Sequence, residues 1–77
     1  MKYVEEVSIR RYEDGDFIIE IEEREDMYEA WLRHREYGVE YSMFDVYKRS
    51  LSGIEEFVEM VERSLKHYEE DYLEEVF

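Results

Sequence analysis

The chain contains no cysteine and no proline, and its three glycines are scattered. Without cysteine, neither a disulfide nor a thiolate metal site can reinforce the fold, and this composition agrees with a reducing compartment. The scattered glycines exclude a Gly-rich phosphate loop, a Walker sequence and a nucleophile elbow. No apolar run approaches the roughly 20 residues that span a bilayer, and the first residues do not resemble a signal peptide. We therefore expect a soluble, cytoplasmic protein.

Side-chain patterns for catalysis or metal binding are missing as well. The two histidines, His34 and His67, are far apart in the sequence, and neither belongs to a His-Glu-x-x-His pattern. We expect each to be a surface or edge side chain. With 23 acidic residues, neighbouring carboxylates are expected by coincidence and do not identify an acid–base pair. The sequence therefore predicts a non-enzymatic protein without a metal or another cofactor.

The size of the chain limits how stable it can be alone. Its 77 residues make one domain, and a domain of this size buries only roughly 60% of its unfolded surface. Aromatic residues make up 17% of the sequence, a large apolar content that also suits an interface. We therefore expect a homodimer.

The chain is strongly acidic along its whole length, with a net charge of −13. Residues 1–38 carry six basic and twelve acidic side chains, and residues 39–77 carry four and eleven. This charge argues against direct binding to nucleic acid or to an anionic membrane, because both require a basic surface. It would attract a basic protein instead. The alternative is that the acidity serves only solubility.

The N-terminal third predicts a β-hairpin. Tyr3–Tyr12, with Val7 between polar neighbours, has the alternation of a strand with one buried face. Asp14-Gly15 then forms a strong hairpin signal because these residues tolerate positive φ. The next strand is Phe17–Arg24, which places Phe17, Ile19 and Ile21 on one face and Ile18, Glu20 and Glu22 on the other.

Residues 27–38 fit either a strand or a helix. Asp26 as a cap and Gly38 as a stop favour a helix, whereas the alternation through Leu32 favours a strand. We prefer the strand, because Gly38 then turns the chain into a further aromatic and β-branched strand, Val39–Lys48. In that strand Trp31 points away from the Leu32 face.

The last third predicts one long helix from Gly53 to Glu75. Ser52 and Glu55 have the spacing of a capping box. An apolar stripe follows at helical spacing and consists of Ile54, Val58, Val61, Leu65, Tyr68 and Tyr72. The whole chain is therefore predicted to be α+β, with a four-stranded antiparallel sheet and one C-terminal helix packed on one face, in the order β-β-β-β-α. The second possibility is the order β-β-α-β-α.

The C-terminal end of this helix is unusually acidic. Its carboxylates repel one another at i,i+4 spacing, and the helix dipole disfavours anions at this end. They are Glu69, Glu70, Asp71, Glu74 and Glu75. One interpretation is a frayed, solvated terminus, and the other is a patch that binds Lys and Arg of another molecule.

Two hypotheses of function follow. Nine acidic residues over a helix of about 35 Å give one charge per about 4 Å, against one per ~1.7 Å for duplex DNA, so the helix alone is a poor mimic. Adding Glu20, Glu22 and the exposed Trp31 to the helix end gives a broader partner-binding surface. The first hypothesis is a binder of the basic surface of a nucleic-acid-handling protein, comparable in size and charge to some anti-CRISPR proteins.

The alternative hypothesis is a structural or antitoxin-like oligomerisation module. It would use an aromatic face of the sheet, because one helix does not have the width to bury five of the tyrosines at once. These are Tyr12, Tyr28, Tyr37, Tyr41 and Tyr47.

Overall fold

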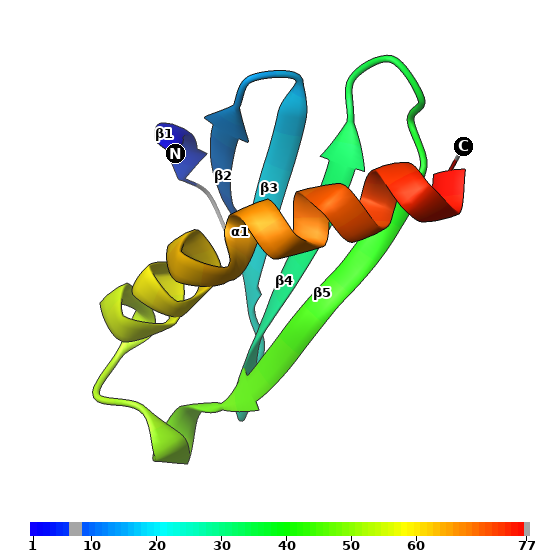
Figure 1. The fold of residues 1–77 in the computed structure, drawn as a ribbon. Coiled ribbons are helices and arrows are strands. Elements are labelled where there is room, and N and C mark those ends of the chain that lie inside the picture. The colour runs from blue at the N-terminus through cyan, green and yellow to red at the C-terminus, as the bar shows by residue number, and fades with distance from the viewer. Residues whose placement is uncertain (7–8, 77) are drawn as a thin grey trace.

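The computed structural model describes the backbone of residues 1–6 and 9–76, and the side chains of residues 1–3 and 10–76. Five strands form one antiparallel sheet in the order in which they follow along the chain, and the helix α1 crosses one face of it (Figure 1). The elements are β1 (Lys2–Glu6), β2 (Ile9–Asp14), β3 (Phe17–Glu23), β4 (Met27–His34), β5 (Glu40–Tyr47), the 3-10 turn η1 (Lys48–Ser50) and α1 (Ile54–Val76).

The predicted α+β class and the C-terminal helix are confirmed, but the sheet has five strands and not four. The segment Tyr3–Tyr12, which we expected to be one strand, forms two antiparallel strands, in which Tyr3 pairs with Tyr12 and Glu6 with Arg10. This segment has no glycine, proline, asparagine or aspartate to signal a turn. The predicted inward position of Val7 lies outside the described residues.

The two β-turn predictions are borne out. Asp14 pairs with Phe17 around a two-residue loop, and Gly15 has a φ of 61°. Gly38, in the connection between β4 and β5, has a φ of 72°, which also favours glycine. Residues 27–34 form the strand β4 and not a helix, because alternate side chains from Tyr28 to His34 are buried.

The cap of α1 differs from the prediction by one residue. Both the hydroxyl and the backbone N–H of Ser52 donate to Oε2 of Glu56, at 2.7 and 2.9 Å, in place of the expected Glu55. These hydrogen bonds lower the pKa of Glu56. Glu55 instead forms an ion pair with Arg10 of β2 at 2.9 Å.

The core lies between α1 and the inner face of the sheet. The helix buries Phe57, Val61, Leu65 and Tyr72, with Glu69 on the same face. The sheet adds a set of buried side chains from β2 to β5: Tyr12, Phe17, Ile19, Ile21, Tyr28, Ala30, Leu32 and Met43. Burial of this apolar surface is the main stabilising contribution to the fold.

Most strand tyrosines belong to this core and not to an exposed aromatic face. Tyr12 and Tyr28 are buried, and Tyr37 and Tyr41 are half-buried against the core. Only Tyr47 of the five is exposed. The helix covers more than expected because the sheet directs most of its aromatic side chains to one face.

His34 is buried, contrary to the expectation of a surface or edge position. Its ring stacks on Tyr37 with a centroid distance of 4.4 Å and meets the edge of Phe17 at 5.0 Å. Its Nδ1 accepts a hydrogen bond from the backbone N–H of Glu36. His34 therefore acts as a core residue that closes the end of β4.

The hydroxyl of Tyr72 joins the helix to the sheet and gives a first prediction. It donates to the carbonyl of Val39 at 2.6 Å and accepts from the backbone N–H of His34 at 3.2 Å. Tyr72→Phe leaves both groups without this partner, and we expect a loss of about 1–3 kcal/mol of unfolding free energy. Thermal unfolding measures the loss, with Tyr68→Phe as the control because Tyr68 is only half-buried. Equal melting temperatures for the two variants would contradict this role.

Two acidic surfaces beside strand β5

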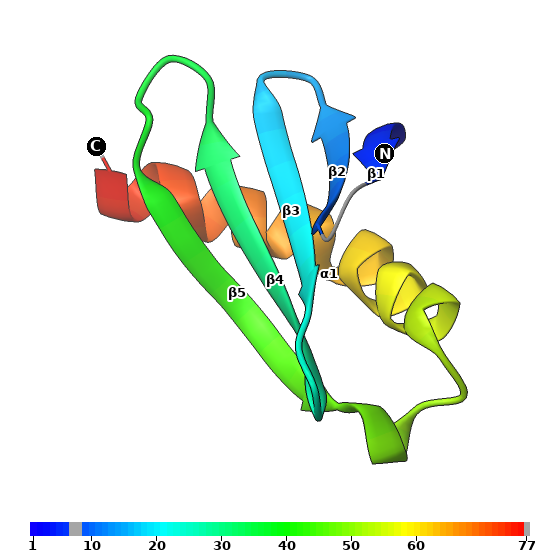
Figure 2. The same cartoon turned by 180° about the vertical axis from the view of Figure 1, so that it is seen from behind.

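The face of the sheet opposite α1 is covered by no other element of the described chain (Figure 2). Because β4 alternates, Leu32 points into the core and the half-buried Trp31 lies on this open face. Trp31 is the only tryptophan of the chain. Its indole N–H donates to Oε2 of Glu29 at 3.3 Å, which fixes the orientation of the ring.

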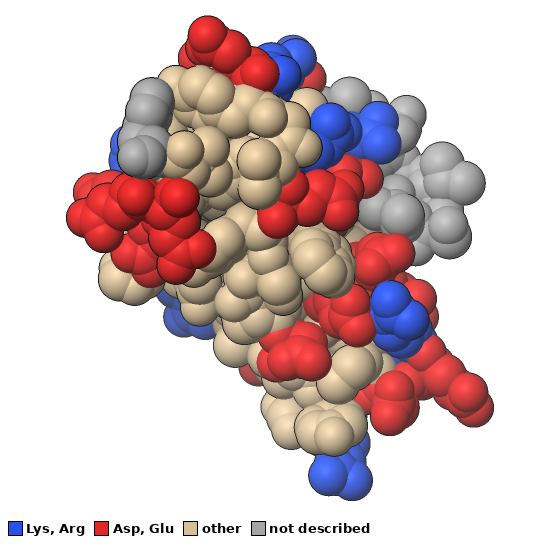
Figure 3. All heavy atoms as spheres, turned by 90° about the vertical axis from the view of Figure 1, so that its right-hand side faces the viewer, with Lys and Arg blue, Asp and Glu red and all other residues tan. Residues whose placement is uncertain are grey.

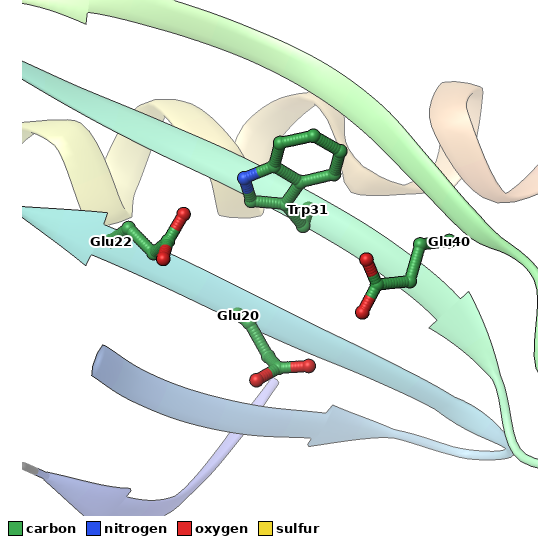
Figure 4. A pocket seen from close by; sticks show the side chains of 4 residues that line it. All are labelled: Glu20, Glu22, Trp31 and Glu40. Atoms are coloured by element: carbon green, nitrogen blue, oxygen red, sulfur yellow. The ribbon is translucent and has the colours of Figure 1, made fainter.

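Three residues predicted for partner binding meet in one shallow pocket of this face. Glu20 and Glu22 of β3, Trp31 of β4 and Glu40 of β5 line a cavity of about 170 Å³. In Figure 4 the carboxylates of Glu22 and Glu40 lie on either side of the Trp31 ring, and Glu20 lies on the neighbouring strand. Sequence reasoning missed Glu40, since its position depends on how β4 and β5 pair.

The charges on this face are only partly compensated. Glu20 accepts hydrogen bonds from Arg11 at 3.4 Å and from Arg33 at 3.2 Å, so two arginines on the neighbouring strands compensate its negative charge. Glu22 lies 3.8 Å from Arg24. Within the described part of the chain no ion pair involves Glu40, which is exposed. An indole ring with carboxylates beside it suits an organic cation such as a lysine or arginine side chain.

The acidic end of α1 forms the second surface. Glu70, Glu74 and Glu75 are exposed, and no ion pair among the described residues involves them. Asp71 is half-buried, with one oxygen 3.3 Å from Nε2 of His67. We define Glu70, Asp71, Glu74 and Glu75 as the acidic helix end.

This helix end borders strand β5. Burial raises the pKa of the Tyr41 phenol, and the negative charges of Glu75 and Asp71 raise it further. The Tyr41 ring, in the first half of β5, lies beside the rings of Tyr68 and Tyr72 of α1, with centroid distances of 6.5 and 6.2 Å, so this part of the helix packs over β5. Figure 3 shows this side of the molecule, where groups of acidic side chains border a surface without charged residues and several of the basic ones lie toward the margins.

Glu69 does not belong to this exposed surface. Its side chain is turned toward the sheet and is only 8% exposed, on the same helix face as Leu65 and Tyr72. Burial, together with a hydrogen bond and the charge of Asp14, raises its pKa to about 8, while Lys66 and the N-terminal amino group oppose the shift. At neutral pH the Glu69 carboxyl therefore holds its proton.

Two kinds of site are not found in the described part of the chain. No group of three or more histidine, aspartate or glutamate side chains is arranged there to hold a metal ion. No helix of these residues is both long and apolar enough to cross a membrane. Comparisons with protein families, curated proteins and solved structures give no significant match, so the function has to be argued from these two surfaces.

Proposed function

We propose that this protein is a non-enzymatic binder that occupies the basic surface of a nucleic-acid-handling protein. The observation that carries the proposal is the acidic helix end, where Glu70, Glu74 and Glu75 are exposed near a helix C-terminus. Their mutual repulsion and the helix dipole both disfavour carboxylates at this position, so these residues do not stabilise the helix. Opposite charge on another molecule would compensate both effects.

The chemistry of the partner follows from the position of the charge. Carboxylates lie on both sides of the first half of β5, with Glu40 on the open face and the acidic helix end on the other side, where Tyr68 and Tyr72 of α1 pack against Tyr41. Such a surface repels phosphates and attracts the Lys and Arg side chains with which proteins contact nucleic acid. Occupying those side chains would prevent nucleic-acid binding, which is how an inhibitor of the anti-CRISPR kind would act.

The oligomerisation module has less support. Its aromatic sheet face would have to be exposed, but the strand tyrosines gather mainly beneath α1. Trp31 and Tyr47 are the aromatic side chains that β4 and β5 present on the open face, and charged residues surround Trp31. A homodimer stays a prediction that sedimentation at micromolar concentration would check.

Capture from the native host tests the proposal directly. The immobilised protein is exposed to nuclease-treated lysate, and bound proteins are eluted with rising salt. We expect a nucleic-acid-handling protein to elute within a few hundred millimolar salt, because exposed charges are screened within about 10 Å at 0.1 M ionic strength. The purified partner must then lose nucleic-acid binding when the acidic protein is added. A partner that binds its nucleic acid equally well in the presence of the acidic protein would refute the proposed function.

A further inference from the structure

We propose that the outer edge of β5 binds a basic, extended segment of the partner as a sixth strand of the sheet. This inference rests on the proposed function and names how the partner is held. It differs from simple attraction between charged surfaces, because it requires hydrogen bonds between the backbones of the two chains.

Strand β5 has the geometry for such an addition. It is the last of the described strands of the sheet and among them pairs only with β4, from Met27 opposite Tyr47 to Arg33 opposite Glu40. Its eight residues give an edge of about 26 Å, and no described strand lies along it. Figures 1 and 2 show that the C-terminal end of α1 crosses the sheet at the first half of β5 and extends past this edge. The backbone groups on this side are available to an extended chain, which is the basis of β-strand addition.

The charge along this edge selects a basic segment. Side chains of an added strand alternate between the two faces of the sheet. On the open face they would meet the exposed Glu40 and Asp45. On the helix side they would approach the acidic helix end, because Tyr41 of β5 packs against Tyr68 and Tyr72 of α1, with ring centroids 6.5 and 6.2 Å apart. Lys and Arg at consecutive positions of the segment would therefore find carboxylates on both faces.

The basic residues that follow β5 are already engaged within the molecule. Lys48 forms an ion pair with Glu23 at 2.9 Å, and the guanidinium of Arg49 lies 4.8 Å from the centroid of the Tyr47 ring. They therefore leave most of the acidic edge uncompensated. Pairing two β5 edges would also bring together two chains that each carry a net charge of −13. The charge favours a basic partner over a second copy.

The Trp31 pocket gives the added strand a further contact and the experiment a signal. Glu40 belongs to both the edge strand and the pocket, and Trp31 is one strand further in. The added strand would lie two strand spacings, about 9.6 Å, from β4, and a lysine or arginine side chain together with the large indole ring can span this distance. Binding at this edge should therefore change the fluorescence of the only tryptophan.

The test uses a peptide of about eight residues in which Lys-Arg pairs alternate with Thr-Val pairs, so that basic side chains reach both faces of the sheet. Two further peptides carry N-methyl groups on alternate amides, one set for each edge of the extended peptide. All three have the same charge, but only one edge of an added strand pairs with β5. We expect one methylated peptide to bind at least tenfold more weakly, and the other to bind like the parent and change Trp31 emission.

Matched variants locate the site. Glu40→Gln should weaken peptide binding severalfold, whereas Glu62→Gln makes the same charge change on an exposed position in the middle of α1 and should have little effect. If both methylated peptides bind like the parent and binding still weakens with salt, strand addition is wrong while the acidic binder stands. If no peptide binds and the protein sediments as a dimer that Asp45→Lys dissociates, the edge belongs to a second copy and the inference is overturned.

Discussion

Glu69→Gln is expected to raise the melting temperature by about 10 °C at pH 8 and to change it little at pH 5. The Glu69 side chain is buried against the sheet beside Asp14, and its pKa is raised to about 8. In the unfolded chain the same carboxyl ionises near pH ~4.3. Between these two values the folded state binds more protons than the unfolded state, so the unfolding free energy falls as the pH rises.

Partial contact with water reduces the effect of the Glu69 charge on the unfolding free energy. We expect a loss of about 2 kcal/mol of unfolding free energy between pH 5 and pH 8, less than the full shift in pKa would give, because nearby charges are screened. Glutamine keeps the shape of the protonated side chain and has no charge to bury. Thermal unfolding of parent and variant across this pH range measures the difference.

The neighbouring Glu70 provides the control. Glu70→Gln removes the same charge from an exposed position one residue away, so it should preserve the fall in stability with pH. The other charged groups that act on Glu69 are Asp14, Lys66 and the N-terminal amino group. Asp14→Asn should therefore also flatten the pH dependence. If Glu69→Gln and Glu70→Gln behave alike, general repulsion in the acidic chain, and not the burial of Glu69 beside Asp14, sets the pH dependence.

The position of Glu69 shows where sequence reasoning about the helix reached its limit. The apolar stripe from Ile54 to Tyr72 predicted the helix and roughly which side of it is buried. In the structure the middle of the buried side runs through Phe57 and Val61. Following that line places Glu69 one turn after Leu65 and inside the core. The acidic residues of the helix end had been grouped by sequence position, whereas burial depends on a rotation of about 100° per residue.

Strand positions were easier to predict, because their period of two leaves little freedom. Glu20 and Glu22 share a face of β3, and Trp31 pairs directly with Glu20 across the strands. Glu40 joins them only because of the β4–β5 register, which shifts between Ala30 and Trp31. A bulge of this kind leaves no signal in a single sequence. The separation of β1 and β2 was missed for a related reason, since no glycine, proline, asparagine or aspartate marks it.

Reversing the charge of the acidic helix end is expected to weaken binding to a basic partner without lowering the stability of the protein. Glu70→Lys together with Glu74→Lys removes an i,i+4 repulsion and places cations where the helix dipole favours them. Both side chains are exposed, so no buried contact is lost. The melting temperature should therefore be unchanged or slightly higher. Binding to a basic partner at low salt should weaken by about 3 kcal/mol, mostly through slower association.

A second double variant distinguishes the position of the charge from its amount. Glu59→Lys with Glu62→Lys changes the net charge equally on exposed positions in the middle of α1, beside Arg63 and Lys66. It should lower the stability slightly, because it places like charges one turn apart, and it should weaken binding much less. Thermal unfolding and stopped-flow association in low salt measure the two effects. If both variants slow association equally, only the net charge matters; if neither does, the acidity serves solubility and the oligomerisation module becomes the better hypothesis.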